Sequence, residues 1–138
     1  MAAKVETTAG TPETLTATEG AFNAYNVEIQ GNIPVQTREG QGGFDNLSGV
    51  PEGHAGTMTF ATDVWWDGTT TMPAWASVLL PACGWVETSQ TYNPTTEAPG
   101  SNVKTVTIGA FEDGVYKKLA GAMGTYRIVL PTGKMAMV

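Results

Sequence analysis

The sequence predicts a mainly β fold: an antiparallel β-sandwich or partial barrel with one flanking α-helix and long loops. Its 138 residues correspond to about one domain of typical size. The 17 Gly, 8 Pro and 21 Thr are typical of short strands joined by turns. Apolar and polar residues alternate in several segments, with the period of two that a half-buried strand requires. We therefore expect residues 1–138 to form a single domain.

Composition excludes several classes of protein. Thirteen acidic and seven basic side chains give a net charge of −6, which disfavours nucleic-acid binding. Cys83 and His54 are each the only residue of their kind, which excludes an intramolecular disulfide and leaves too few ligands for zinc, so we expect no metal and no cofactor. No run approaches the roughly 18 apolar residues of a membrane span, and the first residues lack the apolar core of a secretion signal. We expect synthesis in a cytoplasm and no membrane segment.

The amino-terminal half is expected to contain an arm, two strands and a long loop. Residues 1–22 carry little apolar periodicity and are typical of an extended arm. Residues 25–30 and 58–64 alternate apolar and polar side chains, which predicts two strands, while Pro34 between them indicates an edge or a bend. Residues 38–56 contain six glycines. Because structureless loops of this length are uncommon and usually functional, we expect this one to make contacts.

One helix is predicted, over residues 73–83. Apolar residues recur at helical spacing, Pro73 suits the first turn and Gly84 suits the end. Pro81 removes an internal hydrogen bond, so we expect the helix to kink or to finish at Leu80.

The rest of the chain predicts a loop, a hairpin and two further strands. Residues 88–102 are typical of a loop, and residues 103–119 of a hairpin that turns at Asp113-Gly114. The two-residue turn fixes the register and places Glu112 opposite Val115, Phe111 opposite Tyr116, and Ile108 opposite Leu119. Alternation predicts further strands at residues 126–130 and 134–138, and the second of these is an exposed apolar edge.

The candidate catalytic residues have simpler explanations. Cys83 and His54 are the residue types of a nucleophile and its base, but a cysteine at a helix end beside Trp85 is more often a packing residue. Two pairs of carboxylates are close in sequence, and Asp67 and Asp113 each precede a glycine, as turn residues do. The carboxylate pairs are Asp63 with Asp67 and Glu112 with Asp113. We therefore expect no enzymatic activity.

The tryptophans allow a second interpretation. Four of them flank or occupy the predicted helix, where packing is the simplest role. The adjacent Trp65 and Trp66 point to opposite faces if the chain is extended, so at most one is buried in the same core. The other is a candidate interface anchor, or part of a carbohydrate-binding platform.

The ordered combination of several short motifs resembles the tail tube proteins of tailed bacteriophages, both siphophages and myophages. Pro81 is a departure, since the family more often has a basic residue there. The resemblance covers nearly the whole chain, and its motifs are Lys4 to Thr11, Pro73-Ala74-Trp75, Leu79-Leu80, Ala82-Cys83-Gly84-Trp85, Tyr92-Asn93-Pro94, Val106-Thr107-Ile108, Asp113-Gly114 and Leu119 to Thr125.

This resemblance implies a virion protein that forms rings, typically hexameric, which stack into a hollow tube. Genomic DNA would pass through the tube without specific binding, and other tail proteins would be partners. Residues 38–56 would then be an inter-subunit loop. Polar positions expected to face the lumen are Asn26, Glu28, Gln30, Thr105 and Thr107. Residues expected to contact neighbouring subunits are Arg38, Phe44, His54, Trp66 and Met137.

Three alternatives remain open. The first is another virion component, a tail terminator or completion protein or a capsid decoration protein, with the same acidic, threonine-rich β composition. The second is a carbohydrate-binding module that uses Trp65 or Trp66. The third is a hydrolase built on Cys83 and His54.

Overall fold

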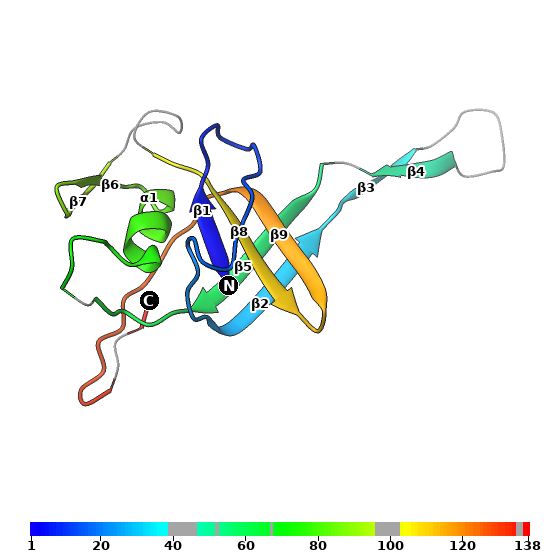
Figure 1. Ribbon diagram of the computed structural model, residues 1–138. Helices are drawn as coiled ribbons and strands as arrows, with labels where there is room; N and C mark the ends of the chain where they lie inside the picture. The colour runs from blue at the N-terminus through cyan, green and yellow to red at the C-terminus, as the bar shows by residue number, and fades with distance from the viewer. Residues whose placement is uncertain (39–46, 52, 67, 96–102, 135–136) are drawn as a thin grey trace. The chain divides into compact units, whose positions relative to one another are not determined.

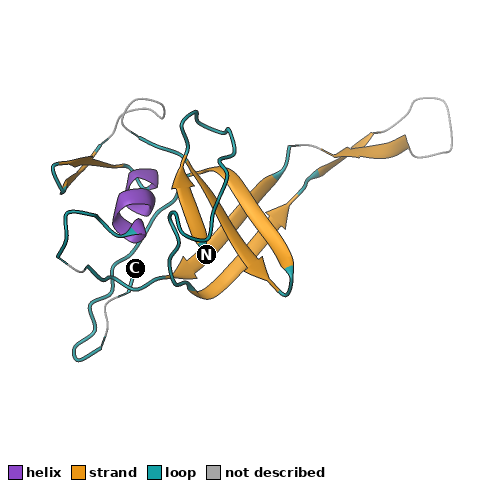
Figure 2. Cartoon of the chain, in the orientation of Figure 1, coloured by secondary structure: helices purple, strands orange, loops and turns teal. Residues whose placement is uncertain are grey.

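The chain is mainly β, as predicted, with antiparallel sheets, one short helical segment and no closed barrel among the described strands (Figures 1 and 2). The computed structural model describes residues 1–38, 47–51, 53–66, 68–95, 103–134 and 137–138. Two compact units are present. The first comprises Met1–Tyr25 and Ala61–Val138, and the second comprises Asn26–Phe60.

A three-stranded antiparallel sheet organises the first unit. Its strands are β1 (Ala2–Val5), β8 (Val106–Glu112) and β9 (Val115–Ala122), in the order β1-β8-β9. The central strand β8 is buried from Val106 to Ala110, as expected for a strand paired on both sides. A Cβ added at Gly109 would lie 2.8 Å from the Tyr116 hydroxyl and 2.9 Å from a Leu15 methyl group, so close packing requires glycine there.

The β8–β9 hairpin has the register that the sequence predicts. Glu112 lies opposite Val115, Phe111 opposite Tyr116, and Ile108 opposite Leu119. The turn residues Asp113 and Gly114 have φ values of 48° and 80°. These angles match a turn with positive φ at both central positions, which Asp-Gly adopts readily.

The amino-terminal segment, residues 1–22, is not a free arm. Its strand β1 pairs with β8, with Ala3 opposite Ile108. The chain then returns alongside β1, where the Ala3 amide donates to the Gly20 carbonyl oxygen at 3.0 Å. A Cβ at Gly20, whose φ is +69°, would lie 1.9 Å from the Ala3 carbonyl oxygen. Composition alone did not indicate this pairing, because a four-residue strand is too short to show clear alternation.

The predicted helix forms, with an unexpected first part. A π-helical turn, η1 (Trp75–Leu79), leads into a short α-helix, α1 (Leu80–Ala82), which packs against strand β6 (Trp85–Thr88). The helix therefore continues past Leu80. Pro81 lies in the first turn of α1, a position at which proline is tolerated.

A second hairpin occupies part of the region expected to be a loop. Strand β6 pairs with β7 (Thr91–Pro94), and Val86 lies opposite Asn93. The turn between them places Ser89 and Gln90 at φ values of 50° and 64°. Neither residue is glycine, so the sequence carries no strong signal for this turn.

The two strands predicted near the carboxyl end are not present among the described residues, and residues 135–136 of the second lie outside them. Residues 123–128 are in no strand, and the predicted strands at 126–130 and 134–138 are represented among the described residues by an isolated bridge between Val129 and Met137. A second bridge joins Met137 to Asp63. Alternation describes which side chains share a face, but a strand also needs a partner for its backbone.

The second unit is a two-stranded β-ribbon. Strand β2 (Tyr25–Asn32) pairs with β5 (Ala55–Ala61), and further along the ribbon β3 (Val35–Arg38) pairs with β4 (Leu47–Pro51). Strand β4 and the start of β5 occupy part of the predicted loop 38–56, so the glycine-rich composition there concealed strands. Residues 39–46 of that range lie outside the described residues.

Candidate functional site

The hairpin turn carries an exposed apolar cluster, here called the tip patch: Phe111, Val115 and Tyr116. These side chains are 80%, 56% and 43% exposed. The Phe111 and Tyr116 rings stack with centroids 4.7 Å apart and an interplanar angle of 28°. The tip patch lies at the end of the hairpin, beyond the buried part of β8. Exposed apolar clusters of this kind mark interaction sites on soluble proteins.

A second exposed apolar region follows β9. We call residues 123–130 the apolar segment. Its large apolar side chains are exposed, and Leu130, at 75%, is the most exposed of them. Within it, the Gly124 amide donates to the Ala82 carbonyl oxygen, and Val129 exchanges two backbone hydrogen bonds with Met137. The apolar members of the segment are Met123, Tyr126, Ile128, Val129 and Leu130.

Strand β9 forms one edge of the three-stranded sheet. In the order β1-β8-β9, it has a strand partner on one side only among the described residues. Lys117 and Lys118 lie on it, and Lys117 forms an ion pair with Glu112. An edge strand presents backbone donors and acceptors to a further strand, while lysines limit unspecific pairing.

The residues expected to face a lumen divide into two groups. Asn26, Glu28 and Gln30 are exposed at alternate positions of β2, and the Gln30 amide donates to the Glu28 carboxylate at 2.6 Å. Thr105 and Thr107 are 7% and 0% exposed. Their hydroxyls donate to the Glu6 carboxylate inside the first unit, so a lumen-facing position for these two threonines is wrong.

The residues expected to contact other subunits differ in exposure. Trp66 is 52% exposed and His54 is exposed. Met137 is partly buried, and its backbone is bonded to Val129 of its own chain. The backbone of Arg38 lies in β3, while its side chain and the whole of Phe44 lie outside the described residues.

The exposed tryptophans are held by hydrogen bonds. Trp65 is 55% exposed, and its carbonyl oxygen accepts the Trp75 indole N–H at 2.8 Å. The Trp66 indole N–H donates to the Thr69 carbonyl oxygen at 3.0 Å. Both contacts restrain the segment, while the Trp65 and Trp66 rings keep about half of their surface open to solvent.

The candidate catalytic groups have structural partners. Burial raises the pKa of the half-buried Cys83 thiol, which reduces the reactive thiolate at neutral pH. The Asp63 carboxylate accepts the Tyr25 hydroxyl at 2.8 Å, while Asp67 lies outside the described residues. The residues that the structure describes contain no cluster of three or more His, Cys, Asp or Glu that would hold a metal ion.

Glu6 is at the centre of a polar cluster that the sequence did not reveal. The residue is 5% exposed. One carboxylate oxygen, Oε1, accepts the Thr107 hydroxyl at 2.8 Å and the Gly121 amide at 2.7 Å. The other, Oε2, accepts the Thr105 hydroxyl and the Gly10 amide, both at 2.7 Å.

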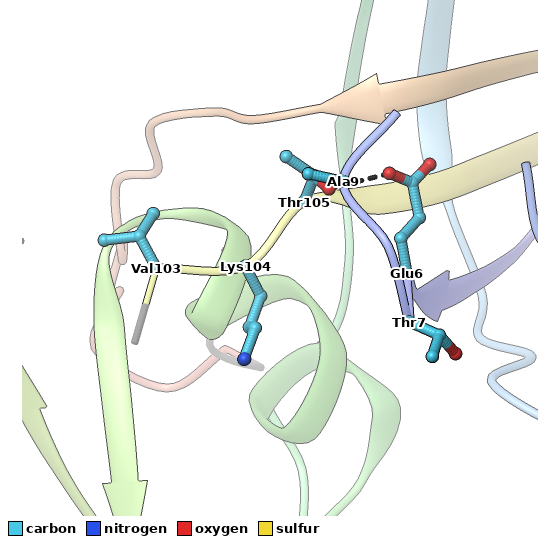
Figure 3. Close-up of a pocket in the computed structure, with 6 residues that line it drawn as sticks. All are labelled: Glu6, Thr7, Ala9, Val103, Lys104 and Thr105. Carbon is cyan, nitrogen blue, oxygen red and sulfur yellow. Dashed lines mark hydrogen bonds between the residues drawn. The ribbon is translucent and has the colours of Figure 1, made fainter. Parts of the chain in front are cut away.

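This cluster borders a small pocket of about 40 Å³, which Figure 3 shows. Burial alone would raise the pKa of Glu6, and its four hydrogen bonds outweigh that effect and lower the pKa below the usual 4.5. The carboxylate is therefore ionised at neutral pH. The pocket is lined by Glu6, Thr7, Ala9, Val103, Lys104 and Thr105.

No family model, curated protein or solved structure matches the chain. Among the described residues, no helix has both the length and the apolar character needed to cross a bilayer.

Proposed function

We propose that the chain is a structural virion protein that self-assembles into stacked rings, which form the tail tube of a bacteriophage. The observation that carries this proposal is the exposure of large apolar side chains in the tip patch and the apolar segment, with Phe111 and Leu130 at 80% and 75%. The motif pattern that resembles tail tube proteins supports the same assignment.

Assembly gives these exposed groups a physical role. Burying one such side chain is favourable by roughly 1.5–3 kcal/mol. A closed ring would also give strand β9 a partner at its open edge, since cyclic symmetry supplies one to every subunit. An isolated two-stranded ribbon is marginally stable in water, so the β3–β4 part of the second unit also gains from packing against other subunits.

In the proposed tube, the exposed face of β2 with Asn26, Glu28 and Gln30 lines the lumen. The chain has a net charge of −6. An acidic lining repels the phosphates of DNA, and a neutral lining does not attract them. Genomic DNA then passes without specific binding, and other tail proteins cap or extend the tube.

Electron microscopy of the purified chain tests assembly. Long tubes are the expected result, while single closed rings would favour a tail terminator, and monomers or inert trimers a decoration protein. The Phe111→Ser variant should lose tubes. Trp65→Ser, at another exposed aromatic residue, is the matched control and should keep them.

The lumen assignment has its own test in assembled particles. Replacing Glu28 with Lys should slow DNA ejection while tubes still form, because a positive ring attracts phosphates. Glu28→Gln is the control, because it keeps the size of the side chain without adding a positive charge. Normal ejection from Glu28→Lys tubes would contradict the lining.

The exposed rings of Trp65 and Trp66 favour a second candidate, a carbohydrate-binding module. The Trp66 ring is held by a hydrogen bond to the Thr69 carbonyl oxygen, and an exposed aromatic face is suited to stacking on sugars. Quenching of tryptophan fluorescence by a glycan, lost in Trp65→Ala or Trp66→Ala but kept in Phe111→Ser, would support it.

A further inference from the structure

The Glu6 carboxylate connects three segments that are distant in sequence. Gly10 lies on the amino-terminal segment itself, Thr105 and Thr107 lie just before and within β8, and Gly121 lies on β9. Each carboxylate oxygen accepts two hydrogen bonds. A single side chain therefore fastens the amino-terminal segment to both strands of the hairpin.

All four donors are neutral groups. Two are backbone amides and two are hydroxyls, so the strength of the cluster comes from the negative charge of Glu6. Figure 3 shows the Thr105 hydroxyl directed at this carboxylate and the Lys104 amine directed away from it. No ion pair joins Glu6 to a cation among the described residues.

Other charged groups near Glu6 belong to three segments. Lys104 precedes β8 and lines the same pocket. Glu13 lies on the amino-terminal segment, where its charge and that of Glu6 repel, and Lys4 of β1 forms ion pairs with Glu13 at 3.8 Å and Glu19 at 3.4 Å. These pairs are partly exposed and contribute little to stability. The segment is also held by the short β1–β8 ladder, by 2.9 Å bonds from the Glu13 amide to the Thr107 hydroxyl and from the Glu6 amide to the Thr105 carbonyl oxygen, and by backbone bonds within residues 1–22.

Protonation would disrupt this arrangement. A proton on one carboxylate oxygen turns that oxygen into a donor that faces a backbone N–H and a hydroxyl. The hydroxyl can rotate and accept, but the amide of Gly10 or Gly121 cannot. The protonated oxygen keeps a lone pair but loses its negative charge, so the N–H of Gly10 or Gly121 loses a charge-assisted acceptor and its hydrogen bond weakens.

We infer that Glu6 is an acid-sensitive clasp, whose carboxylate holds the amino-terminal segment on β8 and β9 and whose protonation releases β1 from the edge of β8. The release leaves the β8–β9 hairpin folded, because the hairpin register depends on its own ladder and turn. Since the four hydrogen bonds place the folded pKa below 4.5, the stabilisation is complete above about that pH and is lost as the pH falls through the lowered value.

Amide hydrogen exchange of the dispersed chain between pH 7 and pH 2.5, corrected for the intrinsic exchange rate at each pH, tests the clasp. Protection of residues 2–5 should fall by about tenfold or more in acid, below pH 4.5, while residues 115–119 stay protected. Thr105→Val removes one donor and should move the midpoint for residues 2–5 to higher pH. Glu6→Gln should lack this protection at every pH.

Glu13→Gln is the matched control, since it neutralises a carboxylate of the same segment that accepts one backbone bond, from Thr7. Its midpoint should stay close to that of the wild type. The proposal is overturned if wild type and Thr105→Val have equal midpoints. It is also overturned if Glu6→Gln keeps full protection of residues 2–5 at pH 7. If Glu6→Gln does not fold, the difference in midpoint between wild type and Thr105→Val still tests the proposal. These measurements need no tubes, so they are independent of the proposed function.

Discussion

Phe111 and Tyr116 face each other across the β8–β9 hairpin and stack at 4.7 Å, although Phe111 is 80% exposed. Only a few positions away on the same strand, Ile108 is 5% exposed and lies opposite Leu119. The hairpin thus has a buried half that stabilises the fold and an exposed half that is available to a partner.

This division predicts that two truncations affect stability and assembly differently. Ile108→Ala should lower the free energy of unfolding by about 2–4 kcal/mol, because it leaves a cavity in the core. Phe111→Ser should lower it by only about 0.5–1 kcal/mol, the contribution of an exposed cross-strand pair, yet abolish assembly. Urea unfolding together with size-exclusion chromatography measures both effects. An equal loss of stability in the two variants would contradict the division.

The Asp113-Gly114 turn predicts a backbone effect. Gly114→Ala should destabilise the chain by about 1–2 kcal/mol, because φ is 80° at this position and a Cβ is unfavourable there. Gly31→Ala is the control, since Gly31 does not have positive φ and a Cβ there meets nothing within 4 Å. It should be neutral or slightly stabilising, as thermal unfolding would show.

The β6–β7 turn offers a stabilising substitution. Ser89 has a φ of 50° without being glycine or asparagine, and Asn tolerates that conformation better. Ser89→Asn should raise the free energy of unfolding by about 0.5–1 kcal/mol. The same substitution at Ser77, which lies in the π-turn, should give no gain. Absence of a difference between the two variants would argue against strain in the turn.

Cys83 should react slowly. Because burial raises the pKa of its thiol above the ordinary value, alkylation by iodoacetamide at pH 8 should be slower in the folded chain than in the chain unfolded by urea. In the folded chain, the rate should still increase above pH 9.0, where a free cysteine is already half ionised. As the pH rises, the Cys83 thiol loses its proton at a lower pH in the unfolded state than in the folded state. The free energy of unfolding therefore falls at alkaline pH. Faster alkylation of the folded chain would instead indicate that Cys83 is an activated nucleophile. Loss of a hydrolase activity in Cys83→Ala would confirm that role.

Local signals predicted the hairpin and the helix well. Asp113-Gly114 determines both the turn and the register, because the positive φ values and the loop length leave no alternative pairing. Pro73 and Gly84 bracket the helical region for similarly local reasons. The π-turn at Trp75–Leu79 was not predictable, since apolar spacing does not distinguish it from an α-turn.

The Glu6 cluster and the structure of residues 126–130 depend on contacts between residues distant in the sequence, which local patterns do not reveal. Glu6 is followed by two threonines in a polar segment and resembles a solvated residue, yet its partners Thr105 and Gly121 lie 99 and 115 residues away. Residues 126–130 alternate as a strand would, but within the described chain their backbone has only the Met137 bridge. The hydrogen-bond partners of Glu6 are therefore distant in the sequence, and residues 126–130 have no strand partner beyond the Met137 bridge among the described residues.

The Gly20 backbone lies so close to the Ala3 carbonyl group that position 20 has no room for a side chain. With a Cβ only 1.9 Å from a carbonyl oxygen, even alanine would clash with the backbone. In a saturation library, position 20 should therefore be depleted of every substitution regardless of size. Gly10, where a Cβ has open space, should show a milder pattern governed by backbone angle alone.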